Sequence, residues 1–233
     1  SGLLIINPDS KTLKYYRQKA EQEETLQQQL TQQQAGESET QTGIKIKLLT
    51  NAGVPEELNL ISKLPCEGIG LFRTEFLYLG KHSLPSEDEQ FAVYRQFASQ
   101  MNPLPVTIRT FDLGGDKLSP LNSETSEENP YLGNRGIRFS LSHPDIFSAQ
   151  VKAILRASAF GKIQIMFPMV MDVEDFIKAR EFVHQCQQEL SHQKITFDPK
   201  IPLGAMIEIP SAALCSEALA KECDFLSIGT NDL

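Results

Sequence analysis

The chain has 233 residues, enough for one large domain or two small ones with a substantial core. Its net charge of −8 argues against a general nucleic-acid binder, which needs a basic surface. Its uninterrupted apolar runs are far shorter than the ~18 residues that a membrane helix needs, so we expect no membrane partner. Any anion site must therefore be a local positive pocket on a mildly acidic protein.

Four cysteines are spread through the sequence without CxxC spacing: Cys66, Cys186, Cys215 and Cys223. None directly follows a predicted strand or lies beside a candidate base. We therefore expect reduced thiols without a catalytic role, as is typical of a cytoplasmic protein.

The first 43 residues predict a strand, a helix and a linker. Residues 2–7 predict a strand that an Asn-Pro turn ends. Ser10 can cap a helix that runs to about residue 34, with a thin apolar seam. The glutamine-rich end of that helix and the residues that follow it predict a solvated helix end and a flexible linker.

From residue 44 onward, short apolar runs alternate with helical patterns. The predicted strands are 44–49, 68–72, 105–110, 162–168, 202–209 and 225–229. The predicted helices are 55–64, 87–101, 144–160, 173–192 and 211–221, and residues 111–142 predict a long loop.

Strands that alternate with helices in this way form right-handed βαβ units around a parallel sheet. Buried parallel strands also read as continuous apolar runs, as these do. A closed (β/α)8 barrel takes ~250 residues, and about 190 residues here hold six strands. We therefore predict the α/β class, as a truncated TIM barrel with about six of eight strands, preceded by a helical linker.

Charged side chains follow several of the predicted strands, at the end where barrel enzymes place their chemistry. Arg73 follows the second strand and Arg109 lies at the carboxyl end of the third, and guanidinium forks hold phosphate and carboxylate groups bidentately. Glu208 lies at the carboxyl end of the fifth strand and Asp232 follows the sixth, and Mg²⁺ prefers carboxylate oxygens. The pattern predicts a pocket for an anion and a hard metal ion, with these four residues as ligands.

Plainer structural roles stay open for some of these groups. Either arginine could serve as an ion-paired structural residue, and either acid could cap a helix. Asp112, Asp116 and Lys117 lie in a glycine-bearing loop, where they bind a ligand or only shape the loop.

Long blocks of this chain, in order, resemble enzyme I of the sugar phosphotransferase system, a family of phosphoenolpyruvate-utilising enzymes. The RTEFL motif at 73–77 resembles enzyme I more closely than pyruvate phosphate dikinase or phosphoenolpyruvate synthase, which share the barrel. The matching blocks are 68–77, 109–117, 128–138, 154–162, 165–169, 206–212 and 224–233.

The resemblance implies a barrel that binds phosphoenolpyruvate (PEP) and Mg²⁺, and a separate domain whose histidine takes the phosphoryl group. That group then passes to a small phosphocarrier protein in the first step of sugar transport, with release of pyruvate. Residues 1–8 would be the end of the phosphohistidine domain, 9–43 the helical linker and 44–233 the PEP-binding barrel. The family also implies a homodimer for the full enzyme.

The resemblance assigns Arg73 and Arg109 to the substrate phosphate and adds Arg135 and Asn231 as substrate ligands. Asn134 stands where the family usually has tryptophan. None of the four histidines has the family's Gly-Thr-Ser-His setting. The acceptor histidine and the cysteine that protonates the enolate are therefore expected outside this chain, and we expect this chain alone to be inactive.

Three other functions remain open from the residues. One is a dikinase or PEP synthase on the same barrel, and another is a Mg²⁺-dependent aldolase or lyase. The third is a regulatory or dimerisation module that binds PEP as a signal. The sequence also leaves open whether the parent enzyme serves sugar transport or its nitrogen-regulatory relative.

Overall fold

The computed structural model describes residues 3–33, 38–78, 83–112, 133–231 and 233. The chain divides into two compact units, Ser1–Lys47 and Leu48–Leu233.

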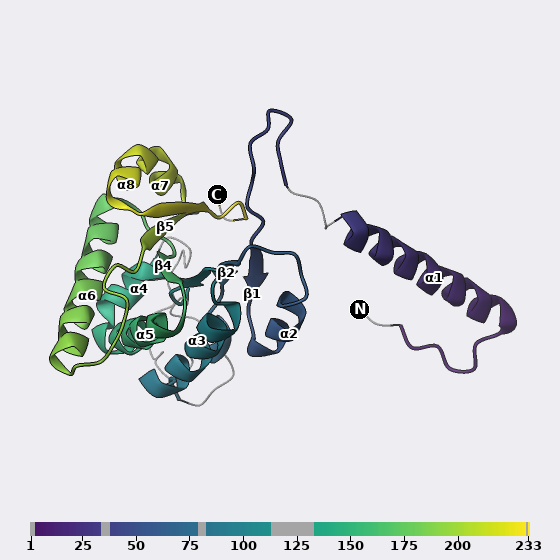
Figure 1. Ribbon diagram of the computed structural model, residues 1–233, viewed down its shortest axis with the longest axis horizontal. Helices are drawn as coiled ribbons and strands as arrows, with labels where there is room; N and C mark the ends of the chain where they lie inside the picture. The colour runs from purple at the N-terminus through teal and green to yellow at the C-terminus, as the bar shows by residue number, and fades with distance from the viewer. Residues whose placement is uncertain (1–2, 34–37, 79–82, 113–132, 232) are drawn as a thin grey trace. The chain divides into compact units, whose positions relative to one another are not determined.

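The first unit is dominated by the helix α1, Ser10–Gln33 (Figure 1). The carboxylate of Asp9 accepts the N–H of Thr12 at 2.7 Å and so caps the first turn. The predicted helix is confirmed, but its cap is Asp9 and not Ser10, which is the first residue of the helix. The strand predicted for residues 2–7 is wrong, because residues 3–7 adopt no regular structure and Leu3, Leu4 and Ile6 are at least three-quarters exposed.

The second unit contains one parallel sheet whose strands follow chain order, β1-β2-β3-β4-β5-β6. This sequential order is that of a TIM-like α/β barrel, so the predicted fold of six barrel strands is confirmed. The strands are β1 Thr50–Ala52, β2 Ile69–Phe72, β3 Val106–Arg109, β4 Ile163–Phe167, β5 Leu203–Ile207 and β6 Phe225–Ile228.

Helices connect successive strands, as βαβ units require. Neighbouring helices pack against one another in the order α3, α5, α6 and α8 (Figure 1). The longer helices are α3 Glu87–Met101, α5 Pro144–Ala157 and α6 Val173–His192. The shorter helices are α2 Leu58–Ile61, α4 Ile137–Ser142, α7 Pro210–Leu214 and α8 Ser216–Glu222, and the 3-10 turns are η1 Pro55–Glu57, η2 Glu75–Leu77 and η3 Ser158–Phe160. Of the helices described, none combines the length and the apolar composition that crossing a bilayer requires.

The core lies between the sheet and these helices. Phe167 of β4 makes edge-to-face contacts with Phe147 of α5 and Phe176 of α6, and all three rings are fully buried. Gly161 lets α3 approach β4 closely, because a Cβ there would lie 2.3 Å from the carbonyl oxygen of Ala98. These contacts hold the strands in the register that positions their carboxyl ends.

Three predicted elements were wrong in detail. The first strand is Thr50–Ala52 and not 44–49, because residues 44–49 lie outside the hydrogen-bonded ladder with β2, and Ile44 and Leu48 are exposed. The short helix α4 lies within the predicted loop 111–142. The predicted helix 211–221 is split at Cys215, whose backbone leaves the helical region with ψ of 16°.

Candidate functional site

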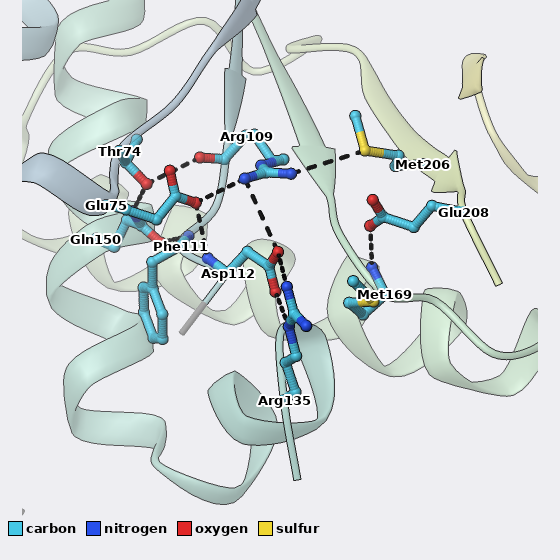
Figure 2. Close-up of polar contacts among 10 residues, drawn as sticks. All are labelled: Thr74, Glu75, Arg109, Phe111, Asp112, Arg135, Gln150, Met169, Met206 and Glu208. Carbon is cyan, nitrogen blue, oxygen red and sulfur yellow. Dashed lines mark hydrogen bonds and ion pairs between the residues drawn. The ribbon is translucent and has the colours of Figure 1, made fainter. Parts of the chain in front are cut away.

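Arg109, the last residue of β3, reaches across the carboxyl end of the sheet. Its Nη2 atom lies 2.9 Å from a carboxylate oxygen of Glu75 and 3.9 Å from one of Asp112. Its Nη1 atom lies 3.9 Å from the sulfur of Met206 on β5 (Figure 2). The side chain is only 11% exposed, so the guanidinium charge is held largely inside the protein.

Asp112 joins Arg109 to Arg135. The guanidinium of Arg135 donates to both oxygens of Asp112, at 2.9 and 3.0 Å (Figure 2). The backbone N–H of Asp112 donates to Glu75 at 3.0 Å. We call Glu75, Arg109, Asp112 and Arg135 the arginine–carboxylate cluster.

The cluster balances two positive charges with two negative ones. Its side chains are between 5 and 16% exposed. Charges at such depth need partners, because their desolvation is otherwise costly. Arg109 still has one buried donor, Nε, without a hydrogen-bond partner among the described residues. The cluster can therefore receive an anion, whose oxygens would share the guanidinium donors with the two carboxylates.

Glu208 follows β5 and is almost fully buried, with 1% exposure. Its Oε1 atom accepts the backbone N–H of Met169 at 2.7 Å. Gly229, just after β6, packs directly against it, because a Cβ there would lie 2.7 Å from the Cβ and 3.0 Å from the Oε2 atom of Glu208. A buried carboxylate is thus held at the strand end, packed closely against a glycine.

This arrangement fits the donor chemistry of Mg²⁺. The described residues contain no group of three or more His, Cys, Asp or Glu side chains that could hold a metal. Mg²⁺ commonly takes only one or two protein carboxylates, with substrate oxygens and waters completing its shell. Glu208 suits that mode, whereas Asp232, its predicted partner, lies outside the described residues.

Arg73 and Asn231 also follow strands at this end of the sheet, but neither belongs to the arginine–carboxylate cluster. Arg73 is exposed, and its backbone N–H donates to the carbonyl of Ala52 at 2.9 Å. Asn231 is exposed after β6. The structure therefore brings Arg109 and Arg135 together and leaves the roles of Arg73 and Asn231 as predictions.

Sequence reasoning missed Glu75 and left Asp112 undecided. Asp116 and Lys117, from the same predicted loop, lie outside the described residues. A usable signal was present, because Glu75 and Asp112 each follow a strand-end arginine by two or three residues. A partly buried arginine needs a counter-charge, and an acid in its own strand-end segment is well placed to supply one.

All four cysteines are free thiols, as predicted. Burial raises the pKa of Cys186 to about 11 and that of Cys223 to about 11. A thiol with such a pKa is protonated near pH 7 and is a poor nucleophile. These two cysteines therefore suit a structural role.

Comparisons with known proteins agree with this geometry. A family model described as "PEP-utilising enzyme, PEP-binding domain" matches residues 27–233. The chain is 43% identical to the phosphoenolpyruvate-protein phosphotransferase of Mycoplasma capricolum subsp. capricolum, over 100% of this chain and 40% of that protein.

Proteins of the same name from two other bacteria give similar values. The one from Staphylococcus carnosus is 42% identical over 100% of this chain and 41% of its own length. The one from Buchnera aphidicola subsp. Schizaphis graminum is 43% identical over 99% of this chain and 40% of its own length. The chain thus spans about 40% of the length of the curated relatives it matches.

Proposed function

Because the chain belongs to the PEP-utilising enzymes and corresponds to their PEP-binding domain, we propose that it binds PEP within a PEP–protein phosphotransferase. The parent enzyme moves the phosphoryl group of PEP to a protein histidine and releases pyruvate, the first step of the sugar phosphotransferase system. The observation that carries the proposal is the convergence of Arg109 and Arg135 on one carboxylate, Asp112.

PEP carries a phosphate and a carboxylate on a three-carbon frame, and Asp112 is held as such an anion would be. Arg135 donates two parallel hydrogen bonds to the two carboxylate oxygens of Asp112. On binding, the oxygens of PEP would share the donors of Arg109 and Arg135 with Glu75 and Asp112. Arg73 and Asn231, at the ends of β2 and β6, are the further substrate ligands that we propose.

Glu208 and Asp232 are the residues that would hold Mg²⁺. When bound, the ion supplies positive charge beside the oxygen on which negative charge develops as the phosphorus–oxygen bond breaks. The Met169 N–H that Glu208 accepts fixes the direction of its carboxylate. The arginines stabilise the charge on the phosphoryl oxygens and keep the substrate in line with the acceptor.

The remaining parts of the reaction belong to the parent enzyme. The acceptor histidine and the cysteine that protonates the enolate lie on segments outside this chain. Residues 1–8 would end the phosphohistidine domain, 9–43 would form the linker and 44–233 the barrel. The phosphocarrier protein takes the group from that histidine, in the cytoplasm, and the full enzyme works as a homodimer.

Calorimetric titration of the full-length protein with PEP, with and without Mg²⁺, tests the site. We expect Mg²⁺-dependent binding that Glu208→Gln weakens by at least about tenfold, because the substitution removes a charged metal ligand. Glu217→Gln is the control, since Glu217 is exposed and its ion pair is with Lys221, on its own helix. Binding that needs no metal and ignores Glu208→Gln would refute the metal assignment.

Transfer chemistry separates this proposal from a module that binds PEP only as a signal. Incubation of the full-length protein with PEP labelled on phosphorus should give labelled histidine and one equivalent of pyruvate. Binding without pyruvate release would favour the signalling function. A requirement for ATP to form PEP would favour a dikinase or synthase, although the relatives above all carry the phosphotransferase name.

A further inference from the structure

A chain of hydrogen bonds between buried polar side chains runs from α3 to the arginine–carboxylate cluster. Its members Thr74, Gln90, Tyr94 and Gln150 are all fully buried. Gln150, on α5, donates through Nε2 to the hydroxyl of Thr74 at 3.1 Å and to that of Tyr94 at 3.2 Å. Tyr94 in turn donates to Gln90 at 3.1 Å. Burying a polar group costs free energy unless the group is hydrogen-bonded. A buried network of four polar side chains therefore points to a specific role.

The network ends on the backbone beside Arg109. The hydroxyl of Thr74 donates to the carbonyl of Arg109 at 3.1 Å, and Oε1 of Gln150 accepts the N–H of Phe111 at 3.0 Å (Figure 2). Between them, the N–H of Thr110 donates to the carbonyl of Met166 on β4 at 2.9 Å. Hydrogen bonds therefore hold the backbone at Arg109, Thr110 and Phe111, the three residues that lead from the end of β3 to Asp112.

The Phe111 N–H and the Arg109 carbonyl also determine which atom donates in each hydrogen bond that links them through Gln150 and Thr74. The Phe111 N–H can only donate, so the oxygen of the Gln150 amide faces it and the nitrogen faces Thr74. The carbonyl of Arg109 can only accept, so the Thr74 hydroxyl accepts from Gln150 and donates to Arg109. The amide of Gln150 meets both requirements, because it donates through its nitrogen and accepts through its oxygen.

We propose that Gln150 is a positioning residue for substrate binding, which acts through Thr74 and Phe111 to set the direction in which Arg109 and Asp112 leave β3. This inference rests on the proposed function, because it assigns the network to the PEP site. Small displacements of a substrate-holding group are costly in binding and rate, and a side chain at a strand end moves with its backbone. Helix α5 thereby supports the site without contacting the ligand.

The pair of variants Thr74→Val and Thr107→Val tests the proposal in the full-length protein. Thr107 is a matched control because it is also buried, and its hydroxyl donates to Gln164 at 3.0 Å within the sheet, two residues before Arg109. We expect Thr74→Val to raise the dissociation constant of PEP by about tenfold, whereas Thr107→Val changes it by less than about twofold. Thr74→Ser keeps the hydroxyl and should restore binding to nearly the wild-type value.

Gln150→Met offers a second test with a side chain of similar length. The thioether cannot donate to Thr74 and is at best a weak acceptor for the Phe111 N–H, so both of the hydrogen bonds that Gln150 makes towards β3 are lost. We expect a rise in KM for PEP larger than the fall in kcat, measured at a temperature where circular dichroism shows each variant folded. If Thr74→Val does not fold, this variant carries the test.

Equal PEP affinities for Thr74→Val and Thr107→Val, or an unchanged KM in Gln150→Met, would overturn the positioning role. Either result leaves the proposed function intact, because the wild-type protein still binds PEP. Failure of the wild-type protein to bind PEP would instead refute the proposed function itself.

Discussion

Arg109 shows how one residue type meets several physical demands at once. Its guanidinium lies 2.9 Å from Glu75 and within 4 Å of Asp112, in a site where its side chain is 11% exposed. Arginine keeps its charge at this depth and offers donors in a planar fork. Glu75 and Asp112 balance the charge of the guanidinium.

Arg109→Lys should separate the effect of the planar guanidinium from the effect of its positive charge on PEP binding. Lysine keeps the positive charge but cannot make parallel hydrogen bonds to two oxygens, so we expect PEP binding to weaken by about 1.5–3 kcal/mol. Titration calorimetry on the full-length protein measures this. Arg95→Lys is the control, since Arg95 is exposed and lies 4.5 Å from the centre of the Phe160 ring. Equal affinities for the two variants would contradict the assignment.

The raised pKa of Cys186 leads us to expect that the free energy of unfolding depends on pH. Burial raises its pKa from 9.0 to about 11. As pH rises above about 9 the unfolded chain loses this proton first, so the folded state holds more protons and stability falls up to about pH 11. Below pH 9 both states keep the proton and this loss is absent.

Urea denaturation at about pH 8 and about pH 10.5 checks this sign. The wild-type protein should lose more stability between the two pH values than Cys186→Ala does, because the variant lacks the thiol. Other groups titrate in the same range, so the difference between the two proteins is the informative quantity. Equal losses would show that the Cys186 thiol does not contribute.

At the scale of elements, local signals and tertiary contacts act together on α3. Ser86 accepts the N–H of Glu89 at 3.2 Å, and the Glu89 carboxylate accepts the N–H of Ser86 at 2.8 Å. This capping box starts the helix where the sequence predicts it. Tyr94 and Phe97 then bury its inner face against the sheet.

Ser86→Ala should destabilise the protein by about 1 kcal/mol, because the first turn loses the acceptor for its N–H group. Chemical denaturation measures the change in the free energy of unfolding. Ser99→Ala is the matched control, since Ser99 is exposed inside the same helix and alanine is a better helix former. A cost as large for Ser99→Ala as for Ser86→Ala would contradict the capping argument.

At the scale of the whole molecule, the core belongs to one of the two units. The largest fully buried side chains, which include Phe72, Phe147 and Phe176, all lie within Leu48–Leu233. The described side chains of α1 in the other unit are almost all exposed. Stability measured on this chain should therefore report mainly the second unit.

Removal of residues 1–47 should leave the main thermal transition nearly unchanged. We expect the midpoints of residues 48–233 and of residues 1–233 to agree within about 3 °C, since few buried groups are lost. Differential scanning calorimetry on both proteins measures the midpoints, and helicity by circular dichroism should fall by the share of α1. A drop of about 10 °C or more would show that the first unit stabilises the second.

The sequence alone determined the barrel class, because the strands and helices are local patterns. Helices α3 and α6 begin and end at the predicted residues, since apolar spacing and caps lie within the segments themselves. The carboxyl-end positions of Arg109 and Glu208 followed from the same patterns. The first strand was misplaced because alternation in residues 44–49 does not show whether a neighbouring strand is there to pair with them.

Only the tertiary structure decided which side chains meet. Glu75 and Arg109 are 34 residues apart, Met169 and Glu208 are 39 apart, and Gln150 reaches Thr74 across 76. Such pairs depend on the register of parallel strands and on how a helix lies against them, and no local pattern records either. The sequence was enough to single out the arginines. Their carboxylate partners Glu75 and Asp112, and the amide of Gln150 that supports their backbone, could be identified only from the packed strands and helices.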